Sequence, residues 1–387
     1  MTKYNRIIIM ILDGAGCGIQ SDYKKYHPHR SNTLLSVYKN NPELHLPKLE
    51  SLGFNKIIFN KNSDRYYAGK LKTLTAGNDT FSGVWEMLGI ITNKRFRSVK
   101  RGWGKKYLKQ IEHKLGIKLI GNEYIEGFQA MDKYFEQHQK EKVPILYFAE
   151  DGIVLLTAHQ KIISAERLAI IGNHLSKILS KSNITRVITR PFVGKPDNFK
   201  RIENKRRDFV TQNYYSPIIK FAGKKINFFT TAHLHRLLNS PKNVKHFTDH
   251  SGNHELMEKT NKLLLTKTKK PTLILTCLQD FDSLAHKKEP YAYARKLKKF
   301  ESQLNKIINI MNRDDLIIIT ADHGCNPTDN YRYHTRELVP IILYSPTLTK
   351  KLWLGKNFTL SSIGQTICRN FSLPPLKYGK AFNKILN

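Results

Sequence analysis

Residues 316–340 read LIIITADHGCNPTDNYRYHTRELVP, and this stretch decides the expected fold. It begins with an apolar run, residues 316–320, that is typical of a fully buried strand. Asp322 and His323 follow at once, and the glycine after them permits the sharp backbone turn that leaves a sheet. His334 lies in the polar, turn-rich segment beyond, so it can fold back toward the same point. We therefore expect a carboxylate and imidazoles at the rim of a sheet.

Two other short apolar runs, residues 7–12 and 271–278, lead into polar side chains in the same way. The carboxyl ends of strands in an α/β sheet meet at one edge, where such folds bind their ligands. Repetition of the pattern therefore predicts an α/β sheet with a polar site at its carboxyl edge. The side chains that follow these two runs are Asp13, Asp280, Asp282 and His286.

Residues 76–89, AGNDTFSGVWEMLG, contain a possible nucleophile. A hydroxyl attacks efficiently only when a base or a metal lowers its effective pKa. Thr80 precedes an apolar helical stretch and is expected at a helix N-terminus, where backbone N–H groups favour a phosphate. The structural alternative is an ordinary helix cap by Asp79 or Thr80, and this segment taken alone favours the cap.

The chain has 387 residues, which is enough for two or three domains. A basic segment that contains glycine interrupts the alternation of strands and helices after residue 95. The residues beyond it have a core pattern of their own, including a helix predicted over 164–179 with Ser164 as its N-cap. We predict a core metal-binding phosphotransfer domain from residues 1–95 and 213–387, and an inserted smaller α/β cap domain over residues 96–212.

Lys and Arg number 65 against 31 Asp and Glu, which gives a formal charge of +34. Such a charge attracts nucleic acid, anionic membranes or phosphorylated metabolites. The lysines are scattered, and no nucleic-acid motif with interleaved aromatic residues is present. We interpret the charge as compositional drift with a solvated surface, with the steering of sugar phosphates as the main alternative, and we expect no nucleic-acid partner.

Cysteine usage and hydropathy predict a cytoplasmic protein without a membrane partner. The cysteines are widely separated and form no CxxC pair, as expected of reduced thiols. The apolar run at 7–12 is shorter than a signal-peptide core of roughly 7–15 residues. No run approaches the roughly 18 apolar residues of a membrane span. The four cysteines are Cys17, Cys277, Cys325 and Cys368.

The residues at the strand ends form two sets of three possible metal ligands. Mixed carboxylate and imidazole ligation suits Mn²⁺ or Zn²⁺ better than Mg²⁺. Two such cations can hold the oxygens of a phosphoryl group during an in-line displacement. Thr80 would then be the nucleophile. The sets are Asp13, Asp322 and His323, and Asp282, His286 and His334.

Six segments, in order over nearly the whole chain, resemble the bacterial phosphopentomutase family of the alkaline phosphatase superfamily. The resemblance implies an alkaline-phosphatase-like core sheet with helices on both faces, an inserted cap and two Mn²⁺ ions, with other divalent cations possible. The last segment is the most specific. The segments are MILDGAG (10–16), TAGNDTFSGVWEMLG (75–89), LGIKLIGN (115–122), TRPFVGKPDNFKR (189–201), DFDSLAH (280–286) and ITADHGCNPTDNYRYHTRELVPIILYSP (319–346).

The resemblance also implies an activity. Members interconvert (deoxy)ribose 1-phosphate and (deoxy)ribose 5-phosphate through a phosphothreonine enzyme and a bisphosphate intermediate, with a sugar bisphosphate as activator. By position in the motifs, Thr80 is the phosphorylated residue, and the two ligand sets above bind the metals. The residues that contact the sugar phosphate correspond to Asp151, Arg190 and either Arg206 or Arg207.

The spacing leaves two positions open. DFDSLAH is one residue shorter than the family's segment, so Asp280 is an alternative to Asp282. The basic cap segment has one extra residue, so Arg206 and Arg207 are alternatives.

Two other functions remain. The first is another phosphosugar mutase or phosphatase of the same superfamily. The second is a basic nucleic-acid-binding protein on an inactive scaffold, which the intact set of ligands disfavours.

Overall fold

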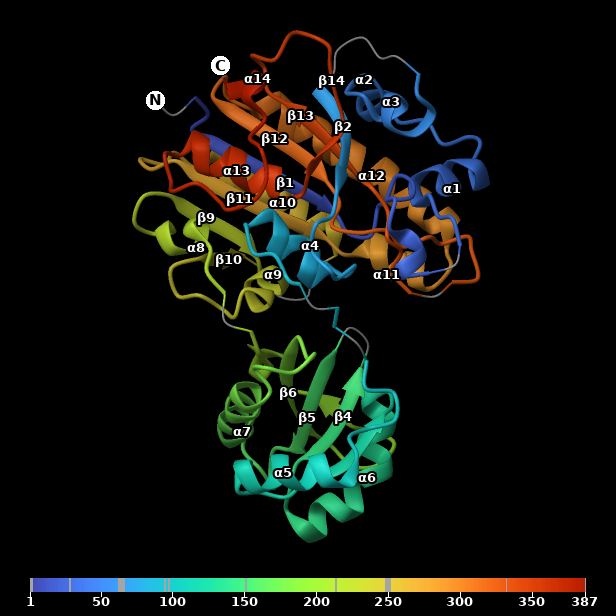
Figure 1. The fold of residues 1–387 in the computed structure, drawn as a ribbon, viewed down its shortest axis with the longest axis vertical. Coiled ribbons are helices and arrows are strands. Elements are labelled where there is room, and N and C mark those ends of the chain that lie inside the picture. Colours follow the sequence, from blue (N-terminus) through green and yellow to red (C-terminus); the bar gives the residue numbers. More distant parts are fainter. Residues whose placement is uncertain are drawn as a thin grey trace. The chain divides into compact units, whose positions relative to one another are not determined.

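The computed structural model describes residues 3–27, 29–61, 67–93, 95–96, 98–149, 152–212, 214–247, 252–331 and 333–386. The chain divides into two compact units (Figure 1). The core unit comprises Met1–Asn93, Tyr215–His235 and Pro241–Asn387. The inserted unit comprises Lys94–Tyr214 and Arg236–Ser240. The second, short return of the chain to the inserted unit was not predicted from the sequence.

An eight-stranded sheet forms the centre of the core unit, in the order β10-β9-β11-β1-β12-β13-β2-β14. Its middle consists of β11 (Thr272–Leu278), β1 (Arg6–Leu12) and β12 (Asp315–Thr320), which are parallel to one another. Every residue of these strands is buried, as continuous apolar runs predict for strands covered on both faces. The three expected strands are confirmed.

The outer strands extend this parallel centre on both sides. On one side, β9 (Asn227–Thr231) and β10 (Lys245–Phe247) continue in parallel. On the other side, β13 (Val339–Tyr344) runs antiparallel to both β12 and β2 (Tyr67–Lys72). The edge strand β14 (Leu352–Thr359) pairs in parallel with β2, with two shifts of register. The core sheet is therefore mixed.

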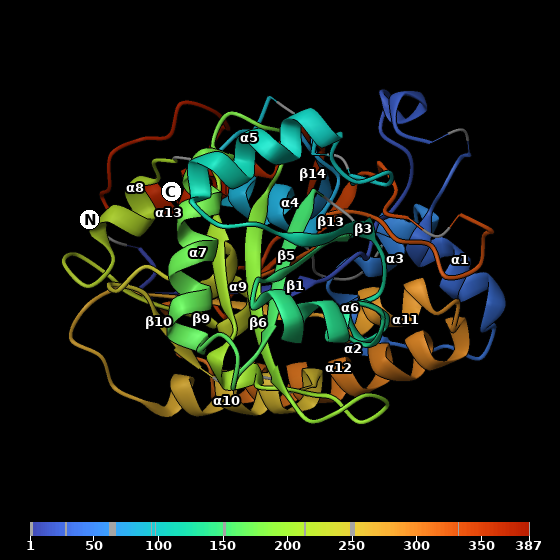
Figure 2. The same ribbon diagram turned by 90° about the horizontal axis from the view of Figure 1, so that it is seen from below.

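Helices cover both faces of the core sheet (Figures 1 and 2), which confirms the predicted fold class. Helices α4 (Thr80–Met87) and α13 (Ser361–Asn370) lie on one face, and α10 (Asn253–Leu265) and α12 (Pro290–Ile310) lie on the other. The remaining helices of this part of the chain are α1 (Thr33–Asn40), α2 (Pro47–Ser51), α3 (Phe54–Phe59), α8 (Pro217–Phe221), α9 (Ala232–Leu237), α11 (Asp280–His286), α14 (Asn383–Leu386) and the short η1 (Tyr23–Lys25).

The inserted unit has its own six-stranded sheet, ordered β3-β4-β5-β6-β7, with β8 paired to β6. Alternate residues of β4 face opposite sides, as the pleat of a strand requires. Leu146 and Phe148 pack with α5 and α7, whereas Ile145 and Tyr147 pack with α6. The elements are α5 (Lys105–Leu115), β3 (Ile120–Tyr124), α6 (Gly127–Glu141), β4 (Ile145–Ala149), β5 (Ile153–His159), α7 (Ala165–Ile178), β6 (Arg186–Val193), β7 (Lys200–Arg201), η2 (Glu203–Lys205) and β8 (Arg207–Val210).

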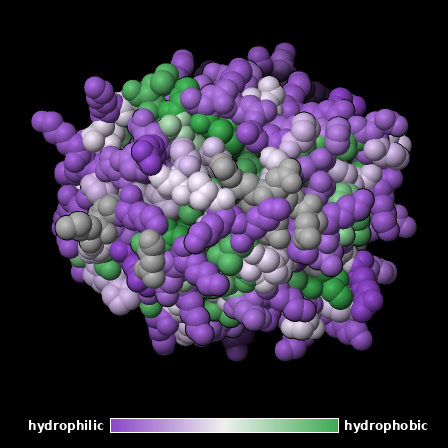
Figure 3. Space-filling view, turned by 90° about the horizontal axis from the view of Figure 1, so that it is seen from above, coloured by the Kyte–Doolittle hydropathy of each residue, from purple (hydrophilic) through white to green (hydrophobic). Residues whose placement is uncertain are grey.

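Side chains on the face seen in Figure 3 are mostly hydrophilic, with small hydrophobic patches between them. This polarity agrees with the 65 Lys and Arg residues of the chain. No helix among the described residues has the length and hydropathy needed to cross a membrane.

Candidate metal centre

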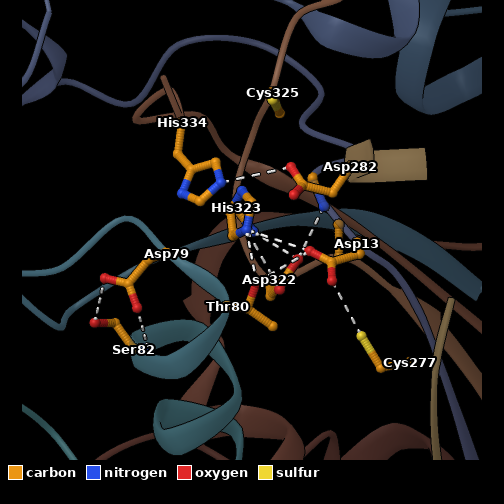
Figure 4. A network of polar contacts seen from close by, with 12 residues as sticks. Asp13, Asp79, Thr80, Ser82, Cys277, Asp282, Asp322, His323, Cys325 and His334 are labelled. Atoms are coloured by element: carbon orange, nitrogen blue, oxygen red, sulfur yellow. Dashed lines mark hydrogen bonds and ion pairs between the residues drawn. The ribbon is translucent and has the colours of Figure 1, made fainter. Parts of the chain in front are cut away.

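The carboxyl ends of the three central parallel strands meet at one edge of the core sheet. The register pairs Leu12 of β1 with Leu278 of β11, and the neighbouring Ile11 of β1 with Thr320 of β12. Segments far apart in the sequence therefore end at the same level of the sheet. The polar side chains that follow these ends form the cluster shown in Figure 4.

Asp13, Asp322 and His323 form the buried half of this cluster. Their ligand atoms all lie within 4.8 Å of one another. His323 Nε2 lies 3.3 Å from Asp13 Oδ1 and 3.5 Å from Asp322 Oδ2. The backbone N–H groups of Gly14 and His323 donate to Asp322 Oδ1, each at 3.1 Å. Asp322 Oδ2, in contrast, is buried without a hydrogen-bond partner among the described residues.

Protonation at this half of the cluster is governed by crowded charges. Burial, and then repulsion from Asp13, raise the pKa of Asp322 to about 8. Burial alone would lower the pKa of His323, but Asp322 and Asp13 raise it well above its usual range. The Nδ1 atom of His323 lies 3.2 Å from the Gly324 carbonyl oxygen and donates to it, so Nε2 faces the carboxylates. A divalent cation in place of the Nε2 proton would relieve this crowding, and these residues therefore fit one.

Asp282, His286 and His334 form the other half. The Nε2 atoms of the two imidazoles lie 3.0 Å apart. Asp282 Oδ2 lies 3.3 Å from His286 Nε2, and Asp282 Oδ1 lies 3.5 Å from His334 Nε2. Burial opposes ionisation of Asp282, but the imidazoles, His334 above all, hold its pKa well below the usual range. Asp282 thus meets the two imidazoles through different carboxylate oxygens, and these side chains also fit a cation.

The two halves adjoin. The ligand atoms of Asp282, His323 and His334 form a further group whose members lie within 4.8 Å of one another, so it joins one half to the other. The alternative carboxylate, Asp280, lies elsewhere: it forms an ion pair with Lys296 and accepts the backbone N–H of Asn253 at 3.3 Å. Of the two aspartates in this segment, Asp282 is thus the one beside the imidazoles.

Thr80 is the first residue of α4, directly after the helix cap. The cap is Asp79, whose carboxylate accepts the Ser82 N–H at 3.0 Å and the Ser82 hydroxyl at 2.9 Å. The Thr80 hydroxyl is left to face the cluster. Its Oγ1 lies 3.2 Å from Asp13 Oδ1 and 3.2 Å from His323 Nε2. Cap and candidate nucleophile are therefore different residues.

Sequence reasoning missed the residues that hold the loop before α4. The buried Arg336 guanidinium donates to the carbonyl oxygens of Thr73, Thr75 and Gly77 at 2.8–2.9 Å and pairs with Asp22 at 3.1 Å. The sequence shows that Arg336 is close to His334, but no sequence pattern predicts that its partners are backbone carbonyl groups of a segment remote in the chain.

Glu86 was missed as well. Its Oε2 atom accepts the N–H groups of Leu74 and Thr75, both at 2.8 Å, and burial raises its pKa to about 7.

Two cysteines also lie at the cluster. Cys277 Sγ donates to Asp13 Oδ2 at 3.3 Å, and Cys325 lies beside Asp282 and His286. The sequence showed the cysteines only as separated thiols.

The predicted sugar-phosphate residues lie in the inserted unit. Asp151 is outside the described residues. Arg190 is mostly buried, its Nε has no hydrogen-bond partner among the described residues, and burial together with the charges of Arg206 and Arg201 lowers its pKa. Arg206 is held by Asp208 through bonds of 2.7 and 2.9 Å, whereas Arg207 is exposed and donates to nearby backbone carbonyls. Clustered guanidinium groups of this kind attract an anion.

Comparison with known proteins identifies the family. The model of the Metalloenzyme superfamily matches residues 5–375. The phosphopentomutase of Clostridium acetobutylicum is 32% identical over 98% of this chain and 99% of its own length. The phosphopentomutase of Caldanaerobacter subterraneus subsp. tengcongensis is 33% identical over 97% of both chains. The chain belongs to the phosphopentomutase family.

Membership confirms the resemblance inferred from the six sequence segments, and it makes the chain an enzyme of the metalloenzyme superfamily. Among solved structures, the PH0037 protein of Pyrococcus horikoshii is similar, with a TM-score of 0.51 over 95% of this chain and 98% of that one. At 13% identity this similarity shows the fold alone. Membership of a metalloenzyme superfamily implies that the chain binds divalent metals, and candidate ligands for them lie at the edge of the core sheet.

Proposed function

We propose that this enzyme interconverts ribose 1-phosphate and ribose 5-phosphate, and their deoxyribose analogues, through a phosphothreonine. The names of its relatives support the reaction. One observation carries the mechanism: the Thr80 hydroxyl lies 3.2 Å from both Asp13 and His323, which belong to a cluster fit for a cation. A hydroxyl in such a place is a candidate for attack on phosphorus.

In this proposal the cluster holds two divalent cations, and we suggest Mn²⁺. Carboxylate and imidazole ligands together suit Mn²⁺ as well as Zn²⁺. When bound, the cations would lower the pKa of the Thr80 hydroxyl and neutralise charge on the phosphoryl group. The proposed ligands are Asp13, Asp322 and His323 for one cation, and Asp282, His286 and His334 for the other.

The proposed reaction has two phosphoryl transfers. Phospho-Thr80 first gives its phosphoryl group to the 5-hydroxyl of ribose 1-phosphate: the bond from phosphorus to Thr80 Oγ1 breaks, a bond to the sugar oxygen forms, and the sugar hydroxyl loses its proton. The product is a ribose 1,5-bisphosphate. This intermediate turns over in the site, and Thr80 Oγ1 then attacks the 1-phosphate. The bond from phosphorus to the anomeric oxygen breaks, that oxygen takes up a proton, and ribose 5-phosphate leaves while phospho-Thr80 is restored. An enzyme without this phosphate would be primed by a sugar bisphosphate.

The inserted unit would bind the anionic sugar. Arg190 and Arg206 are proposed to contact the phosphate that is not being transferred, because a planar guanidinium matches phosphate oxygens in pairs. The buried Arg190 Nε, which has no hydrogen-bond partner in the part of the chain that the structure describes, supports this role. Of the two alternatives, Arg206 is favoured because Arg207 is exposed. Asp151 is proposed as a ribose contact.

The test compares Thr80→Ala with Thr80→Ser. Incubation of the wild-type enzyme with a phosphate-labelled sugar bisphosphate should leave about one label per chain, at Thr80. Thr80→Ala should take up no label and lose at least about 10³-fold in mutase turnover, since the nucleophile is gone. Thr80→Ser keeps a hydroxyl and should retain part of both. Wild-type turnover by Thr80→Ala would refute the mechanism, and release of inorganic phosphate faster than isomerisation would favour a phosphatase.

A further inference from the structure

Cys325 lies inside the candidate metal centre. It follows His323 closely in the chain and is 1% exposed. Its Sγ, a carboxylate oxygen of Asp282 and a ring nitrogen of His286 all lie within 4.8 Å of one another. Figure 4 shows Cys325 and Asp282 on the same side of the cluster. A thiol therefore borders the half of the cluster formed by Asp282, His286 and His334.

The backbone fixes Cys325 in this place. Its N–H donates to the Gly14 carbonyl oxygen at 2.8 Å and to the Thr33 hydroxyl at 3.2 Å. Gly14 has φ of +74°, and a Cβ atom there would lie 3.0 Å from both Asp282 Oδ1 and Cys325 Cβ. The absence of a side chain at position 14 thus leaves room for these groups to approach. Asp282 Oδ1 has no hydrogen-bond partner among the described residues.

We propose that Cys325 is a further ligand, as a thiolate, of the cation bound by Asp282, His286 and His334. The inference rests on the proposed metal centre and extends its ligand set. Thiolates favour Zn²⁺ and Co²⁺ over the harder Mn²⁺, so Cys325 makes this half of the centre more selective for softer metals. Two imidazoles, one carboxylate and one thiolate are all ligands that Zn²⁺ takes in proteins.

Cys277 provides a matched control. It is also buried and also touches the cluster, with its Sγ 3.3 Å from Asp13 Oδ2. It differs in that none of the groups of converging ligand atoms found among the described residues includes it. Each thiol thus hydrogen-bonds a candidate ligand, Cys277 to Asp13 and Cys325 to Asp282, but only Cys325 belongs to a group of converging ligand atoms among the described residues.

Cobalt absorption tests the inference. The metal-free full-length chain is loaded with Co²⁺, and bound cobalt is counted by elemental analysis. The wild-type protein and Cys277→Ser should show a sulfur-to-cobalt charge-transfer band in the near ultraviolet. Cys325→Ser should lack that band but keep the visible cobalt bands, since the carboxylate and imidazole ligands remain. Cys325→Ser should also bind Zn²⁺ at least about tenfold more weakly relative to Mn²⁺ than the wild type does.

The outcomes separate the two proposals. Bound cobalt without a charge-transfer band in the wild type would overturn the role of Cys325 and leave the metal centre standing. The same holds if the band survives in Cys325→Ser or disappears in Cys277→Ser. No cobalt bound at all would instead overturn the metal centre. If Cys325→Ser fails to fold, Cys325→Ala replaces it as the variant that should lack the charge-transfer band. The wild-type spectrum is also recorded after a thiol-blocking mercurial has been added, which should remove the band.

Discussion

Arg336, two positions after His334 in the chain, holds the loop that precedes Thr80. The Arg336 side chain is 3% exposed; its guanidinium donates hydrogen bonds to three carbonyl oxygens and forms an ion pair with Asp22. Arg336→Ala would leave these acceptors buried without donors, so we expect it to lower the free energy of unfolding by about 3–5 kcal/mol. Urea unfolding measures this loss. The exposed Arg295 is the control, and Arg295→Ala should change stability by less than about 0.5 kcal/mol.

Glu86 gives a pH dependence of known sign. Its pKa rises from 4.5 to about 7 on folding, chiefly through burial, so the folded chain binds a proton that the unfolded chain releases. Stability from this group is therefore fully present below pH 4.5 and is lost as the pH rises through 7. Glu86→Gln cannot ionise. Relative to this variant, the wild type should lose up to about 3 kcal/mol across that range.

Urea unfolding of the metal-free wild type and Glu86→Gln at pH 4.5, 6 and 7.5 measures the difference. Both proteins are metal-free. The carboxylates of the cluster titrate as well, but they contribute equally to the stability of both proteins, so the difference between the two reports Glu86. Parallel stability curves for the two proteins would contradict the raised pKa of Glu86.

Individual residues differ in how far the sequence predicts them. Asp13 and Asp322 follow apolar runs directly, so a local pattern places them at the sheet edge. Arg336 and Glu86 have no such pattern, because their partners are backbone groups of a remote loop. Cys325 stands two positions from His323 in the sequence, yet its nearness to His286 depends on how two separate loops turn.

At the scale of elements, the packing of α4 decides where Thr80 stands. Gly83 faces the backbone of the loop after β12, and a Cβ there would lie 2.4 Å from the Asp322 carbonyl oxygen. Gly83→Ala gains helix propensity of about 1 kcal/mol, but the clash would push α4 away from the sheet edge. We expect a net destabilisation of about 1–3 kcal/mol and lower mutase turnover.

Thermal unfolding and a coupled mutase assay test this effect. Gly104→Ala is the matched control, because no heavy atom lies within 4 Å of a Cβ at that position and its φ is −59°. It should leave stability within about 0.5 kcal/mol of the wild type. Equal stability of Gly83→Ala and wild type would show that α4 can shift without cost.

The central strands of the core sheet were predicted from continuous apolar runs, whereas β5 of the inserted unit, which is also apolar and buried, was not predicted. The strands β1, β11 and β12 are buried throughout and were predicted. The antiparallel direction of β13 was not predicted, because an apolar run does not encode direction. The edge strand β14 was not predicted. Its exposed and half-buried residues do not alternate regularly, and its register shifts around Gly355.

At the scale of the whole molecule, the candidate centre joins segments from both ends of the core unit. Asp13 lies near the start of the chain, whereas Asp322 and His323 lie near its end, so a cation bound by all three connects strands that chain connectivity does not. Among the described residues, every group of converging ligand atoms lies in the core unit. Metal binding should therefore stabilise the core unit and leave the inserted unit unaffected.

Chelation tests this coupling. A cation that binds only the folded state adds about 2.7 kcal/mol at a hundredfold excess over its dissociation constant. Removal of metal should thus speed amide hydrogen exchange in β1, β11 and β12, but not in β4 or β5 of the inserted unit. In Asp322→Asn the effect of chelation should be much smaller, because the variant loses a ligand that both Gly14 and His323 orient. Equal effects on both units would mean that the metal binds elsewhere, since a cation stabilises the part of a fold that its ligands connect.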